Sequence, residues 1–153
     1  MIHHLETTQV LPAPLKECWD FFSHPRNLAR ITPAKLDFRI LTELPEEMHA
    51  GLKIEYRVRP LLGIPVRWVS EITQVDPMRS FVDEQRAGPY KSWHHEHHFR
   101  PLDESSTEMR DSVAYELAFG PLGDLVHALV VRRQLRHIFD YRTRAVAEIF
   151  GKR

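Results

Sequence analysis

The sequence predicts an α+β fold in which an antiparallel sheet packs against one long helix. Apolar and polar residues alternate with a period of two from about residue 35 to residue 117, which is typical of strands with one buried face. Residues 120–151 instead carry apolar residues at helical spacing. The chain has 153 residues, of which 42% are hydrophobic and 27% are charged. That size and composition fit one ordered domain, so we expect residues 1–153 to form a single domain.

The N-terminal segment predicts one strand followed by two short helices. Residues 2–11 alternate and indicate the first strand. Pro14 suits the start of a helix, whose apolar face comprises Leu15, Cys18, Trp19 and Phe22. A second short helix is expected to be capped by Ser23 and to end by Thr32, since a proline follows and disfavours helical geometry before it.

The alternating region predicts a run of antiparallel strands. Leu36, Phe38 and Ile40 alternate with charged residues, and residues 52–59 do the same. Hairpin turns are expected at residues 63–65 and at 76–77, where glycine and proline occur. The later strands are then expected at residues 66–75, 80–87, 92–102 and 107–117.

The last segment predicts one long helix that lies across the sheet. Gly120 and Pro121 suit its start and Gly151 its end. At about 30 residues the helix is about 45 Å long. Its predicted buried stripe comprises Leu125, Leu129, Arg132, Arg136, Phe139, Thr143, Val146 and Phe150. This spacing puts Arg132 in the centre of the stripe and Arg136 at its edge.

Several short stretches between residues 64 and 142 resemble one protein family. They are IPVRW (64–68), FVDEQ (81–85), GPY (88–90), WHHEHHF (93–99), FGPLG (119–123), RRQL (132–135) and IFDYR (138–142). Together with the order of elements they resemble a bacterial branch of the START/Bet v 1-like superfamily, also called the SRPBCC or polyketide cyclase/dehydrase-like group. The resemblance covers essentially the whole chain. It implies a helix-grip fold, with a curved antiparallel sheet of about six to seven strands around the C-terminal helix and a cavity between them. It also implies binding of hydrophobic ligands in many members and cyclase or dehydratase chemistry in a few.

The strand around residue 95 has the most unusual pattern in the chain. Side chains two apart share a face of a strand, so the inward face is expected to hold Trp93, His95, His97 and Phe99. The two histidines are candidates for three roles: hydrogen-bonded pocket residues, acid–base or ligand-contacting groups, or metal ligands. Zinc needs a third or fourth donor, and the only further candidates, Asp83 and Asp111, are distant in the sequence. We therefore expect no metal and no cofactor.

Two carboxylates and one arginine are expected to join these histidines. Asp83 shares a predicted strand face with Phe81 and Gln85, and Asp111 shares one with apolar residues. A buried carboxylate is costly unless it is paired, and Arg132 is the partner that the helix pattern offers. This network either ties the helix to the sheet or forms the polar end of a pocket. The complete predicted pocket comprises Tyr56, Trp68, Asp83, Gln85, Trp93, His95, His97, Asp111, Arg132 and Phe139.

Charge and composition narrow the possible partners. Lys and Arg (21) balance Asp and Glu (21), so the chain has no electrostatic footprint for nucleic acid. The single Cys18 excludes an intramolecular disulfide, and no stretch is long and apolar enough for stable membrane insertion. We expect a cytoplasmic monomer or homodimer. Glycines do not cluster, so no phosphate-binding loop is expected.

Three functions follow from these patterns. The first is binding of a small hydrophobic or amphipathic molecule that is lipid-like, aromatic or polyketide-like. The second, less favoured, is a cyclase- or dehydratase-type enzyme with His95 or His97 as acid–base and Arg132 as charge stabiliser. The third is an accessory or regulatory protein with a vestigial pocket.

Overall fold

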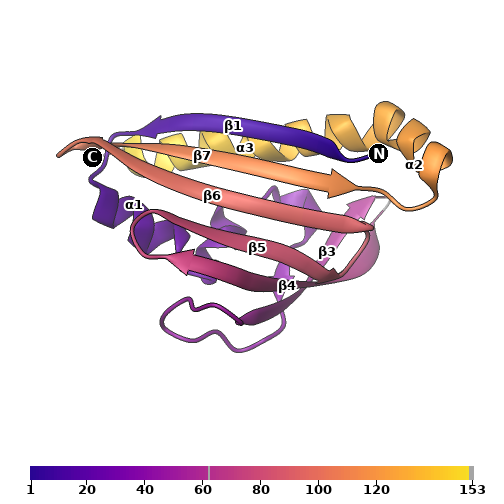
Figure 1. Ribbon diagram of the computed structural model, residues 1–153, viewed down its shortest axis with the longest axis horizontal. Helices are drawn as coiled ribbons and strands as arrows, with labels where there is room; N and C mark the ends of the chain where they lie inside the picture. Colours follow the sequence, from indigo (N-terminus) through magenta and orange to yellow (C-terminus); the bar gives the residue numbers. More distant parts are fainter. Residues whose placement is uncertain (62, 152–153) are drawn as a thin grey trace.

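The computed structural model describes residues 1–61 and 63–151, and its chain runs from one sheet edge through the sheet to a long C-terminal helix (Figure 1). The strands are β1 (His3–Leu11), β2 (Arg39–Ile40), β3 (Lys53–Leu61), β4 (Ile64–Asp76), β5 (Ser80–Ala87), β6 (Ser92–Asp103) and β7 (Ser106–Glu116). The helices are α1 (Leu15–Phe22), the 3-10 helices η1 (Pro25–Ile31) and η2 (Ala34–Leu36), α2 (Gly120–Val126), the π turn η3 (His127–Val131) and α3 (Arg132–Gly151).

The seven strands form one antiparallel sheet in the order β1-β7-β6-β5-β4-β3-β2. In Figure 1, α3 runs behind β1 and β7, and α1 lies near the C-terminal end of α3. The α+β helix-grip fold that the sequence predicts is therefore confirmed. Among the described residues, no helix has both the length and the hydropathy that a membrane crossing requires.

Two predicted details near the N-terminus are wrong. Ser23 does not cap the second helix; it ends α1, where its N–H donates to the Trp19 carbonyl at 2.8 Å. The following segment is a 3-10 helix, and Leu36 ends another one instead of beginning a strand. The chain turns at Asp37, whose φ of 47° is left-handed, because its carboxylate accepts from Arg39 and Arg59, each at 3.1 Å.

The predicted buried stripe of the long helix is correct at Phe139, Val146 and Phe150, and it is wrong at exposed Thr143 and in its N-terminal half. The helix buries His127, Val131, Leu135, Phe139, Arg142, Val146 and Phe150. Arg132 and Arg136 are exposed, and so is Leu129, at 65%. A seven-residue repeat drifts by about 20° per heptad around a straight helix. The π turn adds a further change of phase, because its wider turn puts His127 and Val131 on the buried side.

The apolar core is divided along α3. One cluster joins α1 to the C-terminal end of α3 and includes Phe22, Phe99 and Phe150. A second cluster joins β7 to the N-terminal part of α3 and includes Val113 and Phe139. Buried His95, His97 and Asp111, with half-buried Asp83, lie on the central strands β5, β6 and β7 between these two clusters.

Candidate functional site

Strand pairing brings two histidines and two carboxylates together. Asp83 on β5 is directly opposite His95 on β6, and Asp111 on β7 is directly opposite His97. The hydrogen bonds run diagonally: His97 Nε2 lies 2.6 Å from Asp83 Oδ2, and His95 Nε2 lies 2.8 Å from Asp111 Oδ1. Diagonal neighbours across an antiparallel pair are within reach of long side chains. The register of three strands therefore builds this four-residue cluster.

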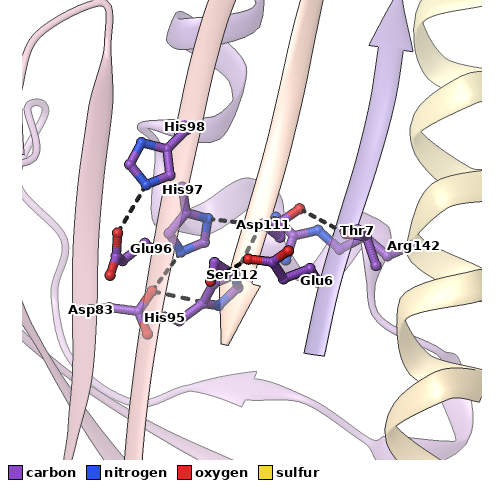
Figure 2. Close-up of polar contacts among 10 residues, drawn as sticks. All are labelled: Glu6, Thr7, Asp83, His95, Glu96, His97, His98, Asp111, Ser112 and Arg142. Carbon is purple, nitrogen blue, oxygen red and sulfur yellow. Dashed lines mark hydrogen bonds and ion pairs between the residues drawn. The ribbon is translucent and has the colours of Figure 1, made fainter. Parts of the chain in front are cut away.

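Each imidazole of the cluster lies between both carboxylates (Figure 2). The rings of His95 and His97 stack with centroids 3.7 Å apart. His95 Nδ1 lies 3.9 Å from Asp83 Oδ2, and His97 Nδ1 lies 3.3 Å from Asp111 Oδ1 without hydrogen-bond geometry. The neighbours His94 and His98 point to the opposite face of the sheet, where both contact Glu96.

Arg142, not Arg132, is the cation of this cluster. Arg142 Nη2 lies 3.6 Å from Asp111 Oδ1, and the Arg142 side chain is buried. Its guanidinium also lies over the rings of Phe22 and Phe139, at 5.8 and 5.9 Å from their centroids. The prediction for Arg132 is wrong because that side chain is exposed. Arg142 lies three residues after buried Phe139, a helical spacing that could have pointed to it.

Asp111 is held from one further direction. Thr7 Oγ1 on β1 donates to Asp111 Oδ2 at 3.5 Å, so side chains from β1, β6 and α3 all contact this carboxylate of β7. Asp111 does not line the cavity, and in Figure 2 it lies on the side of the histidines away from Asp83. Its expected place on the pocket wall is therefore wrong, although it contacts His95, His97 and Arg142, which do line the wall.

Gln85 is a second residue whose predicted place on the pocket wall is wrong. Its side-chain Nε2 donates to the Tyr90 carbonyl at 2.7 Å, and the Tyr90 N–H donates to Gln85 Oε1 at 3.1 Å. Gly88 lets this side chain pack close, since a Cβ there would lie 2.6 Å from Gln85 Oε1. Gln85 thus orders the β5–β6 loop, which in turn positions Tyr90 at the cavity.

The cavity between the sheet and the C-terminal helix has a volume of about 550 Å³. Among the residues that line it are seven of the predicted ones: Tyr56, Trp68, Asp83, Trp93, His95, His97 and Phe139. Trp68 stacks on Tyr56 and meets Trp93 edge-on, with centroids 5.8 and 5.4 Å apart. Most other lining residues are apolar, including Ile54, Ile72, Leu135 and Ile138. The cavity therefore has an aromatic wall and one polar region.

The pKa values of the two buried histidines shift in opposite directions. Burial and the neighbouring His97 lower the pKa of His95, and its hydrogen bond to Asp111 does not offset them. Burial also opposes charge on His97, but its contacts with Asp111 and Asp83 are stronger and raise the pKa of this histidine. These directions favour a neutral His95 beside a charged His97.

Both carboxyl groups of the cluster stay ionised despite burial. Burial would raise the pKa of Asp83, but the hydrogen bond from His97 and the nearby positive charges lower it. Burial acts in the same direction at Asp111, where the Arg142 charge and the two histidine contacts hold the pKa well below its usual range. The lowered pKa values of both carboxyl groups, the raised pKa of His97 and the Arg142 guanidinium together favour a charge-balanced cluster.

A curved sheet around a long helix, with a cavity between them, defines the class of START/Bet v 1-like proteins. A family model described as "Polyketide cyclase / dehydrase and lipid transport" matches residues 11–139. The chain belongs to this family, so the resemblance seen in the sequence is confirmed. No curated protein sequence matches the chain.

Solved structures show the same fold at low sequence identity. A START superfamily protein from Mycobacterium smegmatis has a TM-score of 0.69 and 13% identity, covering 96% of this chain and 99% of that one. The Zhui aromatase/cyclase from Streptomyces sp. R1128 has a TM-score of 0.65 and 19% identity, with 97% and 96% covered. Norcoclaurine synthase from Thalictrum flavum, solved with dopamine and hydroxybenzaldehyde, has a TM-score of 0.66 and 16% identity, with 97% and 88% covered.

Proposed function

We propose that this chain binds a small, largely apolar molecule with a polar group, inside the cavity between the sheet and α3. The observation that carries this proposal is the cavity of about 550 Å³, with an aromatic wall and a single charged region. Cavities of about 300–1,000 Å³ that combine apolar walls with a few polar groups are typical ligand sites. Members of the family to which the chain belongs also support a ligand-binding role.

The polar groups of the cavity indicate which ligand chemistry fits. Asp83 accepts hydrogen bonds, and the 2.8 Å contact of His95 Nε2 with Asp111 puts the proton of neutral His95 there, which leaves Nδ1 as an acceptor. Trp68 Nε1 is a buried donor without a partner among the described residues. An unsatisfied buried donor costs about 1–3 kcal/mol, which a ligand acceptor would recover. These groups favour an aromatic or lipid-like molecule with a hydroxyl group.

The experiment compares binding of 2-naphthol to two tryptophan variants on opposite faces of α3. Leu135→Trp puts a large side chain into the cavity, and His137→Trp puts the same side chain on the exposed face. Calorimetry should show binding to the native chain and to His137→Trp, and at least a tenfold loss in Leu135→Trp. Equal affinity in both folded variants would contradict binding inside the cavity. Norcoclaurine synthase, solved with two aromatic hydroxyl compounds, supports this choice of probe.

An enzyme with acid–base chemistry is the second candidate. The observation in its favour is the 2.6 Å pair of His97 and Asp83, since both side chains line the cavity. An imidazole beside a carboxylate can move a proton to or from a bound molecule. Exchange of the α-protons of 2-acetylnaphthalene in deuterated water, followed by NMR, would reveal such chemistry. The exchange should be lost in His97→Gln while binding persists, and no exchange above that in buffer would oppose this candidate.

A further inference from the structure

We propose that Asp83, His95 and His97 form a binding site for a divalent transition-metal ion, which faces the cavity. One ligand atom from each of these side chains lies within 4.8 Å of the other two. The expectation of no metal depended on the long separation of Asp83 from the histidines in the sequence. Strand pairing removes that separation, because Asp83 is directly opposite His95.

The distances between the donor atoms are close to those that a metal ion requires. His97 Nε2 and His95 Nδ1 lie 2.6 and 3.9 Å from Asp83 Oδ2. Ligands at about 2.1 Å from a tetrahedral ion are about 3.4 Å apart. The two distances to Asp83 Oδ2 therefore need to change by less than about 1 Å, which side-chain rotation can supply. His95 Nδ1 is beyond hydrogen-bond distance of Asp83, so it keeps a lone pair for a ligand.

Asp111 provides the support that metal-binding histidines usually have. The ring nitrogens that face away from Asp83, His95 Nε2 and His97 Nδ1, lie 2.8 and 3.3 Å from Asp111 Oδ1. Metal-bound histidines commonly donate their second ring N–H to a carboxylate, which fixes the tautomer and the ring orientation. Arg142 and Thr7 hold Asp111 in this position. Asp111 thus orients the His95 ring by a hydrogen bond, and it lies beside the second nitrogen of His97 without hydrogen-bond geometry.

The site has a closed side and an open side. Asp83, His95 and His97 line the cavity, whereas Asp111, on the side of the rings away from Asp83, does not. A bound ion would therefore keep at least one position toward the cavity for water or for a ligand oxygen, as catalytic metal sites do. Two imidazoles and one carboxylate suit Zn²⁺, Co²⁺ or Fe²⁺ better than Mg²⁺ or Ca²⁺, which prefer oxygen ligands. This inference does not depend on the ligand proposed above.

The test is calorimetric titration of the chelator-treated full chain with ZnCl₂. We expect one ion per chain, with at least tenfold weaker binding in Asp83→Asn and in His95→Ala. The matched control is His94→Ala with His98→Ala, which removes two histidines from the opposite face of β6. The control should bind as the native chain does. Absence of binding, or binding lost in the control and kept in Asp83→Asn, would overturn the proposal.

A measurement on the native chain covers the case in which the variants do not fold. With Co²⁺ bound, the ring ¹⁵N signals of His95 and His97 should be broadened more than those of His94 and His98. The reverse order would refute the site. Failure of the metal site is also distinguishable from failure of ligand binding. Leu135→Trp should keep Zn²⁺ and lose 2-naphthol, and Asp83→Asn should lose Zn²⁺ and still bind naphthalene.

Discussion

Replacing Arg142 by methionine should strongly destabilise the fold, because it leaves the buried Asp111 carboxylate without its cation. The two groups are 3.6 Å apart, which corresponds to an attraction of about 5 kcal/mol at an effective dielectric constant of about 20. Two effects reduce this figure. The variant no longer bears the cost of burying the Arg142 charge, and Asp111 keeps its contacts with His95, His97 and Thr7. We therefore expect a loss of about 3 kcal/mol, at the low end of the range for breaking a buried pair. Methionine keeps much of the packing against Phe22.

The assay is urea unfolding at pH 7, followed by tryptophan fluorescence, with thermal unfolding as a second measure. A loss of about 3 kcal/mol should lower the melting temperature of a chain of this size by about 6–12 °C. Arg132→Met is the matched control, since Arg132 is exposed on the same helix and should change stability by less than about 0.5 kcal/mol. Equal effects of the two substitutions would refute the assignment of Arg142 as the buried cation.

A double-mutant cycle separates the ion pair from simple packing. Asp111→Asn removes the charge that needs Arg142, so adding Arg142→Met to it should cost less than in the native chain. Contacting charged residues usually show coupling of about 0.5–3 kcal/mol in such cycles. Additive effects, with no coupling, would mean that Arg142 acts through its contacts with Phe22 and Phe139 alone.

Two further predictions concern the start of the C-terminal helix. A Cβ at Gly123 would lie 2.0 Å from the Ala118 carbonyl oxygen, so Gly123→Ala should lower thermal stability by about 1–3 kcal/mol, whereas Gly151→Ala, with open space around it, should not. Burial, followed by nearby positive charges, lowers the pKa of His127 in the folded chain. His127 therefore binds a proton more tightly in the unfolded chain than in the folded chain. The folding stability that the neutral side chain allows above about pH 6.5 is lost as the pH falls below that value. The urea midpoint should therefore fall less between pH 7 and pH 5 in His127→Gln than in the native chain, and equal decreases would contradict this.

The sequence was sufficient to predict the sheet and the inward face of its central strands. Side chains alternate strictly along a strand, so the aromatics around His95 and His97 determined which way both rings point. Hairpin turns after β4 and β6 then fix which strands are neighbours. Asp83 and Asp111 were correctly predicted to face inward for the same reason. The sequence could not give the diagonal hydrogen bonds, because these depend on the register to within one residue.

Rotation of the long helix was harder to predict than the direction of the strand side chains. Successive residues turn by about 100° around a helix axis, so a small error in phase moves a side chain from the buried face to its edge. The sequence also carries no clear signal for the π turn at residues 127–131, which changes that phase. The helical spacing therefore predicted Arg132 at the buried position beside the carboxylates, which Arg142 occupies in the structure. The strand expected at Leu36 failed for a different reason, since ion pairs at Asp37 favour a turn over continued alternation.

The composition of the polar cluster favours a binding site over a purely structural connection between α3 and the sheet. Contact between Arg142 and Asp111 is enough to connect α3 to β7. That connection does not need Asp83, and it does not need two stacked histidines. Buried ionic groups are often no more stabilising than well-packed apolar residues of similar volume. The residues that this connection does not require, Asp83, His95 and His97, line the cavity together with Arg142. The proposed ligand and metal sites would account for Asp83, His95 and His97, which this connection leaves without a role.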